Sequence, residues 1–185
     1  MNEADMARLF QVHREAEARR DYDAVLETFT EDCYLETVPL GLRSEGRAAA
    51  RVAYVGYFSA FPDLAPDDEG TAFGDHVMVT WGHLAGTSGG EWLGVAPTGG
   101  SFRVPFTNIT TFTDGRMAGE SIYFDLATLC EQAGIPLDAI RAAAAQRTAT
   151  TASTRSRPAT FSPGGSTSAA TDRGSALATR ACARA

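Results

Sequence analysis

Two periodic patterns of apolar and polar residues occur along this chain, and they predict the order of its helices and strands. Apolar side chains that recur every third or fourth residue indicate an amphipathic helix, and apolar side chains that alternate with polar ones indicate a strand. The predicted helices are residues 2–19, a short helix that begins near 21, a third over roughly 46–61, one that follows 125, and a short last one near 137–146. The predicted strands are residues 33–38, a weak one around 66–73, 76–86, and the two that flank Asp114-Gly115.

The strongest local signal is the dipeptide Asp114-Gly115. It lies between two alternating runs rich in β-branched and aromatic residues, a setting that favours a tight hairpin turn. The stretch 103–134 therefore predicts a strand, a turn, a second strand and a helix. Asn108 lies on the first of these strands, and Asp125 lies where the second strand gives way to the helix. A sheet that offers an amide and a carboxylate to one cavity could bind a carbonyl compound and move a proton on it.

This order of elements predicts an α+β domain in which a curved sheet wraps around helices and leaves a cone-shaped cavity. With 185 residues, of which 44% are hydrophobic and 21% are charged, the chain has the composition of one globular domain. After Arg147 the composition changes to Ala, Thr, Ser, Arg, Gly and Pro, which offer too little apolar surface for a core. We therefore expect one domain over residues 1–146 and a disordered tail over 147–185.

The distribution of charge argues against two classes of partner. The formal net charge is −7, and every basic residue is an arginine. Six arginines and one aspartate give the stretch from residue 147 onward a charge of +5, so the first 146 residues carry −12. An acidic body repels nucleic acid and anionic lipid, and we expect neither as a partner.

Targeting signals and cysteine usage favour a cytoplasmic protein. The segment at the N-terminus lacks the apolar core of a signal peptide, and no run approaches the roughly 18 apolar residues of a membrane helix. The three cysteines are an odd number without CxxC spacing, which is typical of buried free thiols in a reducing compartment.

Three segments, taken together with the order of elements, resemble a known family. They are Phe61-Pro62-Asp63-Leu64, the run GEWLGVAPTG over 90–99, and the hairpin with its FTDGR turn and the closing Tyr123-Phe124-Asp125. Over about residues 5–135 the chain resembles the SnoaL-like polyketide cyclases (ester cyclases) of the nuclear transport factor 2-like superfamily. The resemblance implies a curved mixed or antiparallel sheet wrapped around three N-terminal helices, with the pocket between them. It also implies that no cofactor is needed and that the protein forms a homodimer.

The same resemblance implies a reaction and a set of residues. Cyclases of this family close a ring by intramolecular aldol condensation of a polyketide-like carbonyl substrate, with an aspartate on the last strand as acid and base. Asp125 holds that position here. Asn108 matches a polar pocket position of the family, whereas Phe106 replaces a second polar one. Ser121 stands where relatives carry a large aromatic side chain, which implies a wider pocket.

Two residues are candidates for catalysis, and each has a structural alternative. Asp125 shares a strand face with Ser121 and Tyr123, although alternation alone does not say which face is inside. A carboxylate walled in by aromatic rings has the raised pKa of a general base, but Asp is equally a favoured N-cap for the helix that follows. Asn108 could donate its NH2 group to an enolate oxygen, or it could simply join two strands.

The remaining candidates are aromatic and polar side chains predicted to line the cavity. Glu36 is either a second carboxylate in the cavity or an exposed strand residue, and His83 is either a ligand contact or a packed, hydrogen-bonded residue. His13 and His76 are expected at the surface. The predicted substrate-binding set is Glu36, Tyr34, Tyr54, Phe58, Trp81, His83, Trp92, Phe106, Ser121 and Tyr123. No motif has metal-ligand spacing, and neither a phosphate-binding loop nor a GxSxG motif occurs, so no metal site is expected.

These observations favour a cofactor-independent SnoaL-like cyclase that acts on a small aromatic or polyketide-like molecule. Two alternatives stay open. Epoxide hydrolases and isomerases of the same scaffold are disfavoured by Phe106, which replaces an Arg, and by Thr37, which replaces a base. A non-catalytic binding module is favoured if Glu36, Asn108 and Asp125 all point outward, because fold does not determine function.

Overall fold

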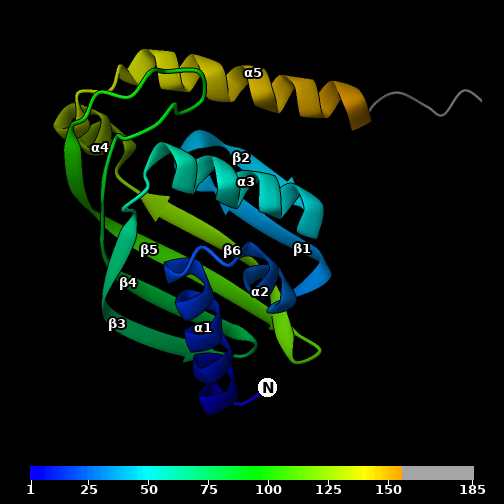
Figure 1. Cartoon of the computed structure of the whole chain (residues 1–185). Coiled ribbons are helices and arrows are strands. Elements are labelled where there is room, and N and C mark those ends of the chain that lie inside the picture. Colours follow the sequence, from blue (N-terminus) through cyan, green and yellow to red (C-terminus); the bar gives the residue numbers. More distant parts are fainter. Residues whose placement is uncertain (156–185) are drawn as a thin grey trace, which may run out of the picture.

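A six-stranded mixed sheet forms the centre of the computed structural model, which describes residues 1–155 (Figure 1). The strand order is β2-β1-β6-β5-β4-β3, in which β1 and β6 run parallel and every other neighbouring pair is antiparallel. The strands are β1 (Phe29–Thr37), β2 (Leu42–Glu45), β3 (Ala65–Gly74), β4 (Val77–Thr87), β5 (Ser101–Thr113) and β6 (Arg116–Phe124). Asp114 and Gly115 both have positive φ in the turn between β5 and β6, as the dipeptide predicts.

The three N-terminal helices cover one face of this sheet and lie in front of its strands in Figure 1. Helices α1 and α3 contact β6 and β1 respectively, whereas α4 packs against β5 and α5 runs beside α4, across the top of the view. The helices are α1 (Glu3–Ala18), α2 (Tyr22–Glu27), α3 (Arg47–Ala60), α4 (Leu126–Ala133) and α5 (Leu137–Arg155), with a short 3-10 helix η1 (Val38–Leu40). The predicted α+β fold, a curved sheet wrapped around three N-terminal helices, is confirmed.

The ends of these helices follow from local chemistry. Asn2 caps α1 by accepting a hydrogen bond from the backbone N–H of Asp5 at 2.9 Å. Asp21 caps α2 in the same way, with the N–H of Ala24 at 3.2 Å. Both side chains satisfy an N–H group that has no partner within the helix. Helix α3 ends before Pro62, because the residue that precedes a proline avoids the helical conformation.

Two hydrophobic clusters fill the space between the helices and the sheet. One joins the N-terminal helices to β1 and β6 and contains Met6, Phe10, Phe29 and Met117 among its fully packed side chains. The other joins the end of α3, the strand β5 and the helices α4 and α5, and contains Phe61, Trp92, Val104, Leu129 and Ile140. Side chains of both clusters line the cavity described below.

Three boundaries differ from the prediction. Strand β1 begins at Phe29, ahead of the predicted start at residue 33, and the short edge strand β2 was not predicted. The tail predicted to be disordered from residue 147 begins too early, because α5 continues to Arg155. The alanine-rich stretch that precedes residue 147 is a strong helix former, and the helix propagates beyond it. The predicted tail over residues 156–185 lies outside the described part of the chain. Within the described part, no helix is long and apolar enough to cross a membrane.

The loop between β4 and β5 folds back onto the end of α3 and buries Trp92. The backbone N–H groups of Gly89 and Gly90 donate to the carbonyl oxygen of Ala60 at 3.0 and 2.9 Å. This approach leaves no room for a side chain, since a Cβ on Gly90 would lie 2.1 Å from the carbonyl oxygen of Ser59. The loop thus depends on glycine to bring an indole ring into the core.

We predict that Gly90→Ala lowers the free energy of unfolding by about 1–3 kcal/mol, because the new methyl group must displace backbone. Gly56→Ala is the matched control: it adds the same methyl group to α3 in open space and should raise stability by up to about 1 kcal/mol. Urea unfolding of the three proteins measures both effects. Equal stabilities of the two variants would show that the loop does not need the close approach.

Candidate functional site

A cavity of about 380 Å³ opens between α1, α3 and the inner face of the sheet. Its size lies within the range of small-molecule pockets. Charged side chains from α1 and β3 also line it, among them Arg14, Glu17 and Asp68. The apolar part of its wall consists of Leu35, Phe58, Phe61, Leu64, Leu84, Trp92, Phe102, Phe106, Ile122, Phe124 and Leu129. The polar side chains inside the cavity are Thr37, Tyr54, Tyr57, Asn108 and Glu120.

The residues of β6 that face the cavity are not the ones predicted. Glu120, Ile122 and Phe124 line the cavity, so the alternation of the strand sends Ser121 and Tyr123 to the outer face. Tyr123 is 43% exposed there. The expectation that Ser121 and Tyr123 contact a substrate in this cavity is therefore wrong.

Asp125 also lies outside the cavity. It is exposed, and it caps α4 by accepting hydrogen bonds from the backbone N–H of Thr128 at 3.0 Å and from its hydroxyl at 2.7 Å. These hydrogen bonds hold the pKa of the carboxyl below its usual value. A catalytic base in an apolar cavity requires the opposite environment, so the expected placement of Asp125 is wrong and its alternative, the helix N-cap, is confirmed.

Four further predicted residues occupy the outer face of the sheet, away from the cavity. Glu36 accepts a hydrogen bond from Ser121 at 2.7 Å. The ring of Tyr34 stacks under the guanidinium group of Arg43. The Trp81 side chain is 42% exposed, and His83 pairs with Glu69 at 2.6 Å. The structural alternative that was considered for His83, a hydrogen-bonded residue, is the observed one, and Glu36 is the strand residue rather than the cavity carboxylate.

The structure brings the other predicted residues together at the cavity. Tyr54, Phe58, Trp92, Phe106 and Asn108 all line it, so four of the ten predicted binding side chains and one of the two catalytic candidates lie at the cavity. The amide of Asn108, however, is turned toward a carboxylate that the sequence reasoning passed over.

That carboxylate belongs to Glu120, which is only 4% exposed. Its Oε1 atom accepts a hydrogen bond from the Asn108 side-chain NH2 group at 2.7 Å. Its Oε2 atom accepts one from the Tyr54 hydroxyl at 2.9 Å. Hydrogen bonds to the ionised form stabilise a buried carboxylate and fix its direction. Glu120 is thus a positioned carboxylate in a mostly apolar wall.

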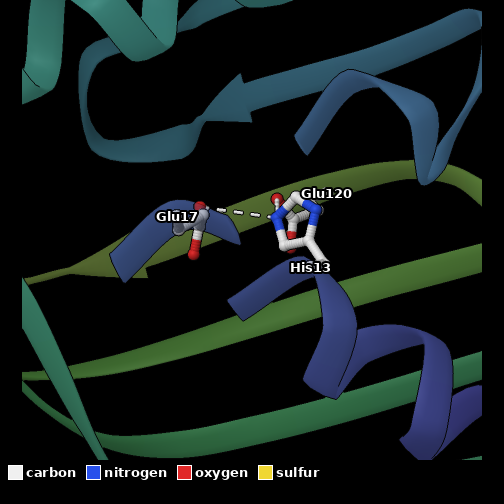
Figure 2. Close-up of side chains that lie close together, drawn as sticks. All are labelled: His13, Glu17 and Glu120. Atoms are coloured by element: carbon white, nitrogen blue, oxygen red, sulfur yellow. Dashed lines mark ion pairs between the residues drawn. The ribbon is translucent and has the colours of Figure 1, made fainter. Parts of the chain in front are cut away.

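Beside Glu120 lies His13, which comes from α1 and is fully buried (Figure 2). The His13 Nε2 atom is 3.4 Å from Glu17 Oε1 and 3.6 Å from Glu120 Oε2. Burial is the largest influence on the His13 pKa and acts to lower it. The carboxylates of Glu17 and Glu120 together outweigh this influence, so that the pKa lies above its ordinary value of 6.5.

The pKa values of two neighbours of His13, Glu17 and Tyr54, are shifted as well. Burial favours the neutral form of Glu17, but His13 and Arg14 outweigh it and lower the pKa of this carboxyl. Burial and then the charges of Glu120 and Glu17 raise the pKa of the Tyr54 hydroxyl well above 10. The group therefore combines two carboxylates, a histidine that favours its charged form and a phenol that holds its proton.

His13, Glu17 and Glu120 also form a cluster of possible metal ligands that the sequence reasoning did not find. The ligand atoms of the three residues all lie within 4.8 Å of one another, and one imidazole with two carboxylates could hold a divalent cation. An (i, i+4) pair on α1 contributes His13 and Glu17, and Glu120 joins them from β6. Linear spacing shows only the first two.

His13 was expected at the surface, but two signals in the sequence indicate the opposite. Met6, Phe10 and His13 recur at helical spacing, so the histidine continues the buried stripe of α1. Glu120 alternates with Ile122 and Phe124 on β6, so its neighbours on that face are apolar. In both cases a polar residue occupies a position that the helical or strand periodicity places on an apolar face. Such a position predicts a buried polar group.

Comparison with known proteins agrees with this architecture. A family model for SnoaL-like polyketide cyclases matches residues 7–133. This chain belongs to the SnoaL-like polyketide cyclase family. No curated protein matches it significantly.

Solved structures share this SnoaL-like architecture at low sequence identity. A Jannaschia sp. CCS1 protein described as a SnoaL-like polyketide cyclase is 22% identical, with a TM-score of 0.66 over 72% of this chain and 94% of that one. AclR of Streptomyces galilaeus, described as a hydroxylase, is 20% identical, with a TM-score of 0.61 over 72% and 98%. A protein of unknown function from Burkholderia pseudomallei K96243, described as NTF2-like, is 19% identical, with a TM-score of 0.59 over 71% and 98%. At these identities the likeness shows the fold, which is nuclear transport factor 2-like.

For this SnoaL-like protein we predict that Asp125→Ala lowers the thermal unfolding midpoint by a few degrees, because α4 loses its cap. Asp125→Asn should restore the midpoint, since asparagine caps a helix as well as aspartate does. Thermal unfolding followed by circular dichroism makes the comparison. A loss of stability in the Asn variant equal to that in the Ala variant would mean that the charge, rather than the cap, is what α4 requires.

We also predict how the stability of this SnoaL-like domain depends on pH. Because the folded pKa of His13 is raised, its charge stabilises the fold fully below about 6.5, and this contribution is lost as pH rises through the folded pKa. Glu17→Gln removes one of the charges that raise this folded pKa, so the contribution should be smaller and its loss should be complete at lower pH. Glu15→Gln on the exposed side of α1 is the matched control. Urea unfolding between about pH 6 and 9 measures the shift, and superimposable pH profiles of the two variants would refute it.

Proposed function

We propose that this protein is an enzyme that closes a ring in a polyketide-like carbonyl compound by acid–base chemistry, with Glu120 as the base. The observation that carries the proposal is the carboxylate of Glu120, buried in the wall of a cavity that is otherwise mostly apolar. An apolar cavity accepts a flat carbon framework, and a single placed carboxylate can accept a proton from it. No cofactor takes part in the proposed reaction.

In the proposed reaction Glu120 removes a proton from the carbon next to a carbonyl group. The resulting enolate carbon attacks a second carbonyl carbon of the same molecule, and the carbon–carbon bond closes the ring. Proton transfer by one positioned base contributes roughly 10²–10⁴-fold to a rate. Asn108 supports this step by holding Glu120 at 2.7 Å. Since its NH2 group is committed to the base, Asn108 acts as a positioning residue, which replaces its expected contact with the enolate oxygen.

The aromatic wall of the cavity supports the same proposal. Phe58, Trp92 and Phe106 contribute flat apolar surfaces to the cavity wall, from α3, the β4–β5 loop and β5. Such surfaces fold a flexible chain so that its reacting carbons meet. Holding two reacting groups of one molecule in contact lowers the barrier by removing the entropy cost of bringing them together.

A non-catalytic small-molecule binding module is the second candidate. One observation favours it: both oxygen atoms of Glu120 already accept hydrogen bonds, from Asn108 and Tyr54. A carboxylate of this kind can serve to fix the shape of a binding cavity. The two candidates differ in whether the carboxylate is needed for turnover or only for binding.

We predict that Glu120→Gln lowers the rate of ring closure by at least about 100-fold while a bound ketone still raises the thermal stability of the protein. The probe is 1-phenylhexane-1,5-dione, whose intramolecular aldol closure gives a hydroxycyclohexanone that loses water in a separate step to a conjugated cyclohexenone, which absorbs in the ultraviolet. Glu36→Gln is the matched control, because Glu36 lies on the outer face of the same sheet. Full turnover by Glu120→Gln would refute the assignment of the base. Ligand binding by the wild-type protein without any turnover would favour the binding module.

A further inference from the structure

We propose that Tyr54 is the general acid of this site and that His13, buried behind it as an imidazolium, supplies its proton. This proposal rests on the proposed function, in which Glu120 is the base, and adds the acid that an aldol closure also requires. The alkoxide formed when the ring closes must gain a proton. The argument follows the direction of each hydrogen bond around His13.

At the Nδ1 atom the direction is fixed by a threonine. The hydroxyl of Thr28 donates its only hydrogen to the carbonyl oxygen of Val25 at 2.6 Å. The same hydroxyl oxygen lies 2.8 Å from His13 Nδ1, so the hydrogen in that contact belongs to the histidine. Nδ1 therefore carries a hydrogen.

At the Nε2 atom the direction is fixed by Tyr54. The Tyr54 hydroxyl donates its only hydrogen to Glu120 Oε2 at 2.9 Å. Its oxygen is also 3.2 Å from His13 Nε2, and this contact must use a hydrogen on the nitrogen. With both ring nitrogens protonated, His13 is an imidazolium. A protonated Nε2 atom has no free lone pair with which to bind a metal ion. The positive charge that faces the two carboxylates is therefore that of the imidazolium ring, in place of a metal ion.

The surrounding charges favour this state from every element that packs on the ring. Glu17 on α1 and Glu120 on β6 place carboxylates 3.4 and 3.6 Å from Nε2. Arg14 on α1 is the one opposing charge, and it is itself paired with Glu17 and Asp68. Tyr54, the titratable group from α3, is neutral. The two anions explain why a fully buried histidine holds a second proton.

The cavity wall assigns the roles of the two residues. Tyr54 lines the cavity, whereas His13 does not reach it. A substrate can therefore take a proton from the tyrosine hydroxyl, and only the tyrosine can take one from the histidine. Tyr54 is the catalytic residue in this proposal, and His13 acts through it.

The proton transfers balance over one cycle. Glu120 takes the proton from the substrate carbon, the new carbon–carbon bond forms, and the electrons of the attacked carbonyl group move to its oxygen. Tyr54 gives its hydroxyl proton to this alkoxide, and His13 returns a proton to the phenolate through Nε2. The proton on Glu120 then passes across the Tyr54 oxygen to His13, over the contacts of 2.9 and 3.2 Å. The protein ends the cycle as it began, and the product has gained one C–C bond and one O–H bond.

The first test uses Tyr54→Phe with 1-phenylhexane-1,5-dione in deuterated water. Tyr123→Phe is the matched control, because it removes the same hydroxyl from a tyrosine on the outer face of the sheet, which does not line the cavity. We expect Tyr54→Phe to slow ring closure by at least about 100-fold while deuterium still enters the carbon next to the carbonyl group, because Glu120 is intact.

Two outcomes of this test would overturn the proposal. Unchanged ring closure would show that Tyr54 gives no proton. Loss of both deuterium incorporation and ring closure would show that Tyr54 only holds Glu120 in place. The proposed function fails separately, if Glu120→Gln still incorporates deuterium at the wild-type rate.

The second test needs neither substrate nor variant. Nitrogen-15 NMR of the wild-type protein at neutral pH should show hydrogen on both ring nitrogens of His13, with exposed His76 as the internal reference for a ring at the surface. A neutral His13 ring would overturn the proposal. A titration with Zn²⁺ completes the test: a stoichiometric change at Nε2 would show that the cluster holds a metal instead of a proton.

Discussion

The cavity depends on a buried cluster of titratable side chains that come from opposite layers of the fold. His13 and Glu17 belong to α1, where His13 Nε2 lies 3.4 Å from Glu17 Oε1, and Glu120 belongs to β6, with its Oε2 atom 3.6 Å from the same nitrogen (Figure 2). Removing a carboxylate from water costs several kcal/mol unless hydrogen bonds and an opposite charge compensate for it. Glu120 receives both, from Asn108, Tyr54 and His13. The same contacts hold α1 against the sheet, so the group that carries the chemistry also fixes one wall of the cavity.

This arrangement separates two uses of the sheet. The inner face combines an apolar wall with one polar cluster, which is the environment that alters proton affinities. The outer face holds residues of the same kinds, including Glu36 and His83, but these are partly exposed, and Glu36 is paired with Ser121 and His83 with Glu69. Residue type alone is therefore a poor guide to the site in this SnoaL-like fold. The face of the sheet on which a side chain lies decides whether it reaches the cavity and can act on a substrate there.

Much of the fold but the smaller part of the candidate site could be predicted from the sequence. The helical pattern at α3 and the Asp114-Gly115 turn are local signals, and the structure follows both. The face of β6 was predicted wrongly, because a period of two describes both faces of a strand equally well. Asp125 lies at the N-terminus of α4, and its side chain caps the free N–H group there instead of entering the cavity. The contact between His13 and Glu120 joins residues far apart in the chain, and no local pattern contains it.

The most direct measurement is a crystal structure of the protein soaked with 2-acetylnaphthalene, a flat aromatic ketone that has no second carbonyl group and therefore does not cyclise. Our account predicts that the ring lies between the aromatic walls of the cavity. The ketone oxygen should lie within hydrogen-bonding distance of the Tyr54 hydroxyl, with the methyl carbon next to a carboxylate oxygen of Glu120. A ketone bound beside Asp125, on the outer face of the sheet, or with its carbonyl group turned away from Glu120 would contradict the account.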